Sequence, residues 1–191
     1  MKIGIFNHHS IADKDPALLA QRAEELGFDS FWLREHPIVP VVTSRPVPDV
    51  LSETVDPFIA LARASAVTKT IKLGTSICVV PEHNPLLLAK EVATLDHFSG
   101  GRFLFGIGGG WIKEGSEIMG ADWEHRWTQI RDAIMAMKEL WTKDDAEYHG
   151  RYYDFPPVRS FPKPAQKPHP PLLLGGRAKN VFKRIVEYGD G

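Results

Sequence analysis

The stretch from residue 71 to residue 111 restricts the possible folds more than any other part of the chain. Residues 71–79 form a nearly unbroken apolar run of strand length, which is typical of a parallel strand covered on both faces. Asn84-Pro85 is a typical helix start and Gly100-Gly101 a typical helix end, so we expect a helix between them. Residues 102–107 form the next strand. Two parallel strands joined by a helix make a right-handed crossover unit.

The second of these strands runs into three consecutive glycines, Gly108, Gly109 and Gly110, followed by Trp111. Glycine after a parallel strand lets the backbone come close to a ligand, and ligands of α/β proteins lie at the carboxyl ends of the strands. A tight connection to the next helix, without a ligand, accounts for the run equally well. The dinucleotide-binding fingerprint GxGxxG does not fit, because its third glycine position falls on Trp111.

Composition and charge exclude several classes of function. The chain has 191 residues, enough for one domain with its own core. Its 23 lysines and arginines nearly balance its 24 aspartates and glutamates, which does not favour a polyanionic partner or a membrane surface. Basic residues interleaved with aromatic ones do not occur as a patch, so we expect no nucleic-acid partner.

Cysteine usage and hydropathy point to a cellular compartment. Cys78 is the single cysteine, which excludes an internal disulfide and a cysteine metal cluster and favours a reducing environment. The sequence contains no apolar run of transmembrane length, and its first residues lack the layout of a signal peptide. We therefore expect a cytoplasmic protein that does not insert into a membrane.

The rest of the chain repeats the alternation of strand and helix. We expect strands at 2–6, 28–33 and 172–174, helices at 15–27, from 56 onward, at 123–143 and at 177–188, and a small hairpin at 148–155. Two proline-rich segments interrupt this pattern. Residues 37–55 form a long irregular loop, which is typical of functional segments, and residues 156–171 form an extended surface connector.

Five strands, each followed by a helix or by a loop and a helix, favour an α/β fold. A (β/α) barrel and an open doubly wound sheet both fit this pattern. A closed eight-stranded TIM barrel takes about 250 residues. We therefore expect a single domain over residues 1–191 that corresponds to an N-terminal portion of a TIM (β/α)8 barrel, with about five βα units, incomplete at its C-terminus.

Several motifs together resemble the bacterial-luciferase-like monooxygenase superfamily. They are spread over nearly the whole chain: Leu73-Gly74-Thr75-Ser76, Asn84-Pro85, Ala93-Thr94-Leu95-Asp96, Ser99-Gly100-Gly101-Arg102, Gly106-Ile107-Gly108-Gly109-Gly110-Trp111, Leu140-Trp141, Pro170-Pro171, Gly175-Gly176 and Gly189-Asp190-Gly191. The resemblance is greatest to the branch that uses the deazaflavin coenzyme F420, and the neighbouring branch uses FMN. It implies a TIM barrel that binds the coenzyme ring at its C-terminal mouth, without the last three strands.

The resemblance also implies roles for particular residues around the ring. It places Glu35 and His36, at the end of the second strand, in the ring pocket as catalytic residues. It places Ser76 and Ile77 at a bulge of the third strand, where a non-proline cis peptide supports the back of the ring. The glycine loop at residues 108–110 would pass the edge of the ring.

The coenzyme phosphate is expected at the next glycine pair. By resemblance, Gly175, Gly176, Arg177 and Ala178 receive it through backbone amides at a helix N-terminus, which is a favourable anion site. Arg177 is equally well explained as a phosphate partner or as an ordinary solvated charge at a helix start.

Other candidate residues have two readings each. His36 is at a strand end, where its imidazole can carry a proton during hydride transfer, or it is a buried structural histidine. His8, with its neighbour His9, follows the first strand and either contacts substrate or ligates a metal, although adjacent side chains on an extended segment point apart. Trp111 flanks the ring and substrate or only caps the mouth. Cys78 reads as core rather than as a nucleophile.

Three further residues read as structural. Glu114 reads as a carboxylate at a helix start, although it lies near enough to the glycine loop to contact the ring or substrate. Asp96 and Arg102 are expected to hold the helix-to-strand turn together.

The sequence thus predicts an oxidoreductase that transfers a hydride between F420, or FMN, and a small organic substrate. Three alternatives stay open: an FMN-dependent monooxygenase, a non-catalytic flavin-binding or partner-binding barrel fragment, and a metal-dependent hydrolase using His8, His9 and His36. We expect no bound metal, and a homodimer is compatible with the resemblance.

Overall fold

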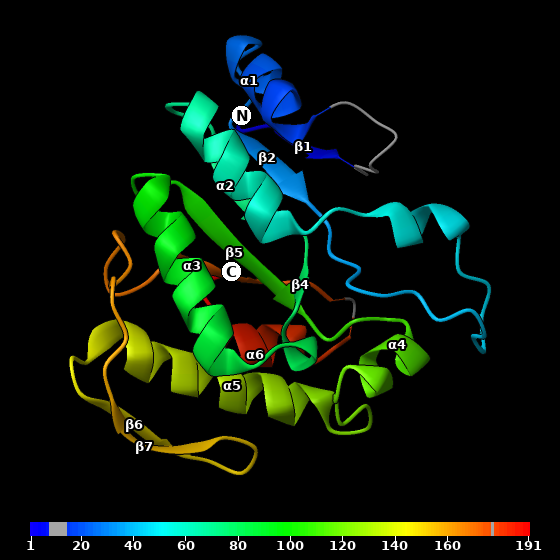
Figure 1. Cartoon of the computed structure of the whole chain (residues 1–191), viewed down its shortest axis with the longest axis vertical. Coiled ribbons are helices and arrows are strands. Elements are labelled where there is room, and N and C mark those ends of the chain that lie inside the picture. The colour runs from blue at the N-terminus through cyan, green and yellow to red at the C-terminus, as the bar shows by residue number, and fades with distance from the viewer. Residues whose placement is uncertain (8–14, 177) are drawn as a thin grey trace.

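The computed structural model describes residues 1–7, 15–176 and 178–191, and its centre is a parallel sheet (Figure 1). The strands of this sheet are β1 (Gly4–Asn7), β2 (Ser30–Leu33), β3 (Lys72–Thr75), β4 (Cys78–Val79), β5 (Phe103–Gly108) and β8 (Leu172–Leu174). Each pairs in parallel with its neighbours, in the order β1-β2-β3-β5-β4 with β8 also beside β5.

β3 and β4 both pair with β5, and when they are taken as two pieces of one strand, the strands lie side by side in chain order. In a doubly wound sheet the strand order reverses once, and such a reversal is absent among the described strands. The open doubly wound alternative is therefore wrong, and the arrangement is that of a partial (β/α) barrel.

The third strand consists of two pieces. β3 pairs with the beginning of β5 (Leu73 with Phe103) and β4 with its end (Cys78 with Ile107). A cis peptide bond between Ser76 and Ile77 separates them, as the resemblance implied. The expectation of one continuous strand over residues 71–79 is wrong at this point, because an apolar run reports burial and not the continuity of the backbone.

β5 approaches this break closely. The hydroxyl of Thr75 donates a hydrogen bond of 2.7 Å to the carbonyl of Gly106, and a Cβ atom at Gly106 would overlap the Thr75 carbonyl oxygen. A glycine is therefore required where β5 passes the break.

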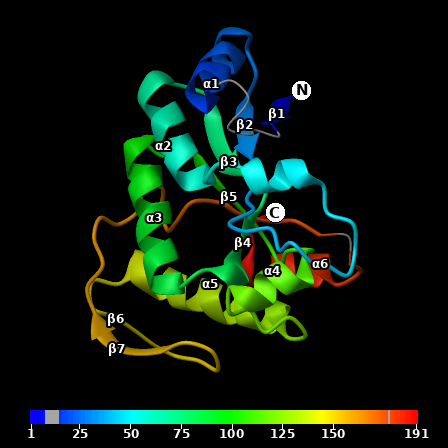
Figure 2. The ribbon, with the colours of Figure 1, turned by 45° about the vertical axis from the view of Figure 1, so that its right-hand side comes forward.

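Helices cover the outside of the sheet. They are α1 (Pro16–Glu25), α2 (Pro57–Val67), α3 (Pro85–Phe98), α4 (Lys113–Ile118), α5 (Arg126–Thr142) and α6 (Val181–Tyr188), with short 3-10 helices η1 (Asp49–Glu53) and η2 (Val80–Glu82). Figure 2 shows α1, α2, α3 and α5 following one another around the strands, and each contacts the next. Among these described helices, none is long and apolar enough to cross a membrane.

Three helix starts were predicted correctly from their caps. The side chains of Asp15, Asp56 and Asn84 each accept a hydrogen bond from a backbone N–H in the first turn, and a proline follows each of them. α5 begins at Arg126 rather than at residue 123, because the side chain of Asp122 accepts from the backbone N–H of His125 and holds a turn there.

The core lies between the helices and the sheet. Its largest fully buried side chains come from both layers: Phe31, Leu33, Leu61, Leu73, Leu88, Phe103, Phe105, Ile107, Ile130, Ile134 and Met137. On the other face of the sheet, Trp32 lies over Gly4 and Gly74 of the neighbouring strands, where any Cβ would meet the indole.

Beyond α5 lies an antiparallel hairpin of β6 (Ala146–His149) and β7 (Asp154–Val158), away from the parallel sheet (Figure 1). The hairpin was predicted, and the proline-rich segment after it runs back to β8 as an extended connector. Its Gln166 donates to the buried Asp96 carboxylate, and Arg102 donates to carbonyls of Ser65, Thr68, Ile71 and Ser99. Asp96 and Arg102 therefore have the structural role expected of them.

Candidate functional site

A cavity of about 390 Å³ opens at the carboxyl ends of the strands. Its lining comes from the ends of β1, β2, β4 and β5 and from the loop at 37–55: Phe6, Arg34, Glu35, His36, Pro48, Leu51, Ser76, Ile77, Val79, Gly110 and Trp111. Six residues predicted from the sequence meet here, although they are far apart along the chain: Glu35, His36, Ser76, Ile77, Gly110 and Trp111. We call this the ring cavity.

His36 stands at the rim of the ring cavity. It is half-buried, and its ring meets that of Trp111 edge-on, with centroids 6.3 Å apart and an interplanar angle of 88°. Burial and then the positive charge of Arg34 lower the pKa of His36, while Glu35 acts in the opposite direction. The imidazole is therefore neutral near pH 7, which leaves one ring nitrogen free to accept a proton.

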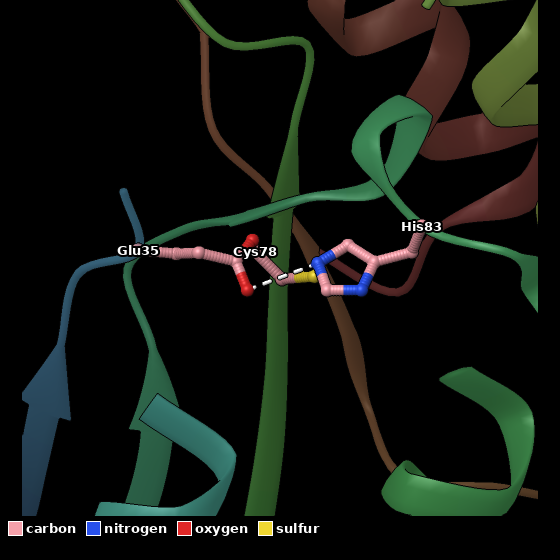
Figure 3. A group of neighbouring side chains, drawn as sticks. All are labelled: Glu35, Cys78 and His83. Carbon is pink, nitrogen blue, oxygen red and sulfur yellow. Dashed lines mark hydrogen bonds and ion pairs between the residues drawn. The ribbon is translucent and has the colours of Figure 1, made fainter. Parts of the chain in front are cut away.

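Glu35 lines the ring cavity, and its side chain points toward Cys78 and His83 (Figure 3). Glu35 is 4% exposed. Its carboxylate accepts a hydrogen bond of 2.6 Å from the Val79 backbone N–H and lies 3.0 Å from Nε2 of His83. These two contacts fix the chain directly after the cis peptide. The geometry therefore favours a positioning role for Glu35 over the catalytic role that the resemblance implied.

The sequence analysis missed His83. Burial lowers its pKa, but the hydrogen bond and charge of Glu35, followed by Glu91 and Glu82, outweigh burial, and the pKa of His83 is raised. The raised pKa favours the protonated form of His83, whose Nε2 lies 3.0 Å from the Glu35 carboxylate. Its partner lies 48 residues away along the chain, so nothing local to His83 marks it.

Cys78 completes the group in Figure 3. The ligand-type atoms of Glu35, Cys78 and His83 lie within 4.8 Å of one another, close enough to meet at a metal ion. Burial and the neighbouring Glu35 raise the pKa of the Cys78 thiol well above its usual range, whereas a metal binds the thiolate. The Glu35 carboxylate already contacts the Val79 N–H and His83. We therefore interpret Glu35, Cys78 and His83 as a hydrogen-bonded support rather than as a metal site.

Two glycines and Ile77 form the floor beside the ring cavity. A Cβ at Gly108 would lie 2.9 Å from Cδ1 of Ile77, and one at Gly175 would lie 2.8 Å from its Cγ2. Both strands, β5 and β8, therefore leave space for the Ile77 side chain. Gly108, predicted beside the ring, and Gly175, predicted at the phosphate, thus share a contact with Ile77, while the contact of either with a coenzyme stays a prediction.

The expected phosphate site at a helix N-terminus is wrong in one respect. α6 begins at Val181, so Gly176 and Ala178 precede the helix and do not offer its first amides. A turn precedes the helix, in which the Val181 backbone N–H donates a hydrogen bond of 3.0 Å to the Ala178 carbonyl. Arg177, like His8 and His9, lies outside the described residues.

A second cavity of about 390 Å³ adjoins the ring cavity and shares Gly110 and Trp111 with it. The 37–55 loop, α4 and the start of α5 line it. Glu114 lies here at the start of α4, where its carboxylate accepts from the Ser44 backbone N–H at 2.7 Å. The prediction that Glu114 is a carboxylate at a helix start is therefore confirmed. Its hydrogen bond to Ser44 also connects the 37–55 loop to α4.

The surface of the ring cavity is mainly apolar. Ile77, Val79 and Leu51 supply apolar surface, and few polar groups reach the opening, which is the usual composition of a cofactor site. The fold and site together define a partial (β/α) barrel with a ligand cavity at its C-terminal mouth.

Comparison with known proteins assigns the family. Residues 9–191 match the luciferase-like monooxygenase family. The chain belongs to this family.

Three relatives indicate the range of the family. An uncharacterised protein of Mycobacterium tuberculosis (strain ATCC 25618 / H37Rv) is 40% identical over 187 residues, which cover 92% of this chain and 66% of the relative. The oxygenase component of a flavin-dependent trigonelline monooxygenase from Acinetobacter baylyi is 34% identical, over 90% of this chain and 45% of that protein. An F420-dependent glucose-6-phosphate dehydrogenase from Amycolatopsis mediterranei is 30% identical, over 93% and 52%.

Solved structures agree on the fold. The monooxygenase RslO1 from Streptomyces bottropensis is 27% identical with a TM-score of 0.78, over 91% of this chain and 53% of that one. The F420-dependent tetrahydromethanopterin reductase from Methanopyrus kandleri is 24% identical with a TM-score of 0.77, over 100% and 54%. This chain therefore spans about half of these luciferase-like barrels.

Proposed function

We propose that the chain forms the ring-binding part of an oxidoreductase that uses coenzyme F420 and transfers a hydride to or from a small organic substrate. The observation that carries the proposal is the ring cavity, where a neutral His36 faces the Ser76–Ile77 break across a largely apolar space. The F420-dependent relative from Amycolatopsis mediterranei, similar over 93% of the chain, supports the choice of coenzyme. When bound, the coenzyme supplies the hydride chemistry.

In this proposal the protein positions the reactants and manages a proton. His36 accepts or donates the substrate proton at its free ring nitrogen, and its lowered pKa keeps that nitrogen available at neutral pH. Ile77, Gly108 and Gly175 hold the back of the ring. Trp111 limits access of water to the mouth, where it stands edge-on to His36.

Glu35 and His83 act indirectly in this proposal, by supporting the lining of the ring cavity. Their ion pair and the bond from the Val79 amide keep the break between β3 and β4 in place, so the ring meets a fixed surface. Such support reduces the freedom of the groups that contact a ligand.

A second candidate is an FMN-dependent monooxygenase. The flavin-dependent relative from Acinetobacter baylyi is 34% identical over 90% of this chain, and the ring cavity does not distinguish the two tricyclic rings. The same cavity, His36 and supporting residues would then serve oxygen transfer to the substrate.

Coenzyme titration tests the proposal. The fluorescence of F420 and of FMN is followed as the 191-residue chain is added, and again with the chain extended by the remaining strands of a related barrel. We expect saturable binding, with F420 bound more tightly than FMN. Tighter binding of FMN would favour the monooxygenase. Failure of both forms to bind either coenzyme, together with stoichiometric metal, would support a hydrolase instead, while binding without turnover would indicate a binding module.

A further inference from the structure

The glycine loop at 108–110 packs against a hydrogen bond between two side chains. The hydroxyl of Ser116, on α4, donates to Oε1 of Glu82, in η2, at 2.6 Å. Ser116 is 1% exposed. Burial raises the pKa of Glu82, and the charge of Glu35 adds to this, while the bond from Ser116 and the charge of His83 act in the opposite direction. Perturbed carboxyl groups occur at functional sites and in structural networks alike, so the position of the pair decides its role.

Gly110 is enclosed by this pair. Its φ of +69° suits glycine, and a Cβ atom there would lie 3.1 Å from Oγ of Ser116, 3.0 Å from Cγ1 of Val79 and 3.6 Å from Oε1 of Glu82. The Ser116–Glu82 hydrogen bond therefore forms one wall of the space that the Gly110 backbone fills. Because Gly110 lines both cavities, this wall lies directly behind the mouth.

Trp111 follows Gly110 and depends on its position. The indole lines both cavities and meets the ring of His36 edge-on at 6.3 Å. Trp111 is 45% exposed, so neighbouring side chains restrict the indole only in part. The backbone on either side of Trp111, at Gly110 and at the start of α4, must supply the rest of the restriction. Both of these segments contact the Ser116–Glu82 pair.

α4 also contacts the loop that follows His36. A Cβ atom at Gly115 would lie 3.4 Å from Cδ of Pro40, and Glu114 accepts a hydrogen bond from the Ser44 backbone N–H. α4 is thus held between η2 on one side and the 37–55 loop on the other. Ser116 is the residue of α4 that makes the hydrogen bond to η2.

We propose that Glu82 and Ser116 are positioning residues, whose hydrogen bond holds Gly110 and α4 so that Trp111 stays at the mouth of the ring cavity, edge-on to His36. Misplacing a group at a reactive site by about 1 Å lowers the rate by about a hundredfold. The consequence for turnover rests on the proposed function, whereas the position of Trp111 does not.

Fluorine NMR of the chain labelled with 5-fluorotryptophan tests the position of Trp111 without coenzyme. The chain has five tryptophans, and Trp111→Phe identifies the signal of Trp111. We expect Ser116→Ala and Glu82→Ala to shift and broaden this signal, and to leave unchanged the signals of Trp32 and Trp141, which line neither cavity. Glu82→Gln keeps an acceptor for the Ser116 hydroxyl and should shift the signal less than Glu82→Ala.

Ser99→Ala is the matched control. Ser99 is 3% exposed and its hydroxyl donates to the Asp96 carbonyl at 3.1 Å, but it lies before β5 rather than after it. A Trp111 signal that stays in place in both alanine variants at the mouth, or that moves as far in Ser99→Ala, would overturn the proposal.

A pH titration of the same signal needs no alanine variant. Ionisation of Glu82 strengthens the hydrogen bond from Ser116, so the Trp111 signal should move as Glu82 loses its proton, above the ordinary pKa of a glutamate. The other titratable groups that face Glu82 or Trp111 are Glu35, Cys78, His83 and His36. Glu82→Gln removes only the Glu82 step. An identical titration of Trp111 in both proteins would overturn the proposal, even if the alanine variants fail to fold.

Turnover with the preferred coenzyme tests the catalytic consequence. Ser116→Ala and Glu82→Ala should lower kcat about tenfold to a hundredfold, with a urea midpoint no lower than that of Ser99→Ala, and Glu82→Gln should lose less. A displaced Trp111 signal with unchanged kcat would overturn the positioning role in the reaction. If the unaltered chain binds neither F420 nor FMN, the proposed function fails, and the NMR result alone decides whether the pair positions Trp111.

Discussion

His36 and His83 both lie near Glu35, and their surroundings shift their pKa values in opposite directions. Burial and Arg34 lower the pKa of His36, while the contact with Glu35 overcomes burial and raises the pKa of His83. One imidazole is thus available as a proton acceptor at the ring cavity. The raised pKa of the other favours its protonated form, which is paired with the Glu35 carboxylate.

Replacing His36 tests its proposed catalytic role. His36→Gln should reduce the rate of coenzyme-dependent turnover by roughly 10²- to 10⁴-fold, the usual contribution of a general acid or base. Coenzyme affinity and the unfolding midpoint should change little, because His36 is only half-buried. The exposed His125 offers a control, His125→Gln. Equal turnover in the two variants would leave His36 with a structural role only.

Stability should depend on pH through His83. The pKa of His83 is raised by folding, so its contribution to stability is complete below the unfolded value of about 6.5 and is lost as pH rises through the higher folded value. The free energy of unfolding, measured with urea at several pH values from 6 upward, should therefore fall as this histidine deprotonates. His83→Gln should be less stable at the acid end and should show a smaller decrease. An identical pH dependence in both proteins would contradict the ion pair with Glu35.

At the scale of the elements, the sequence predicted what local chemistry determines. The caps at Asp15, Asp56 and Asn84 marked three helix starts, and the apolar runs marked the parallel strands. The start of α6 was misplaced by four residues, because the glycine pair Gly175-Gly176 marks a break in the pattern but not the turn from Ala178 to Val181 that precedes the helix.

The candidate site was predictable to a similar extent. The strand-end residues Glu35, His36 and Gly110 were found because parallel strands bring their carboxyl ends together. The break in the third strand was anticipated only by family resemblance. His83 was missed, because its partner Glu35 lies 48 residues away along the chain.

The hairpin provides a test at this scale, because one carboxylate joins it to α5. Asp132 is 6% exposed and accepts from the Tyr148 hydroxyl at 2.7 Å and from the backbone N–H groups of Tyr152 and Tyr153 at 2.6 and 3.1 Å. Asp132→Ala should cost about 3 kcal/mol, since it leaves buried donors unsatisfied. Hydrogen exchange should increase first in β6 and β7.

The control for this prediction is Asp145→Ala, which removes a surface ion pair with Arg159 near the same hairpin. Such pairs contribute between zero and about 1 kcal/mol. If both variants unfold at the same urea concentration, the anchoring role of Asp132 is wrong.

At the scale of the whole molecule, the described sheet is an arc with two open edges. β1 pairs only with β2, and β8 pairs only with β5, among the described strands. Large apolar side chains are exposed near both edges: Ile3 and Phe6 beside β1, and Phe182 and Val186 on α6. Unpaired strand edges and exposed apolar surface both favour association.

The 191-residue chain should therefore self-associate. Sedimentation velocity over a range of concentrations should show dimers or larger species that become more abundant with concentration. Extending the chain by the remaining strands of a related barrel should reduce the larger species, because the added strands cover both edges. A monomer at all concentrations would contradict this prediction.

The most direct test of the central claim is a crystal structure of this chain with its preferred coenzyme. The account predicts that the ring lies in the ring cavity, between His36 and Ile77. A ring bound elsewhere on the molecule, or a ring cavity that stays free of coenzyme at saturating concentration, would contradict it.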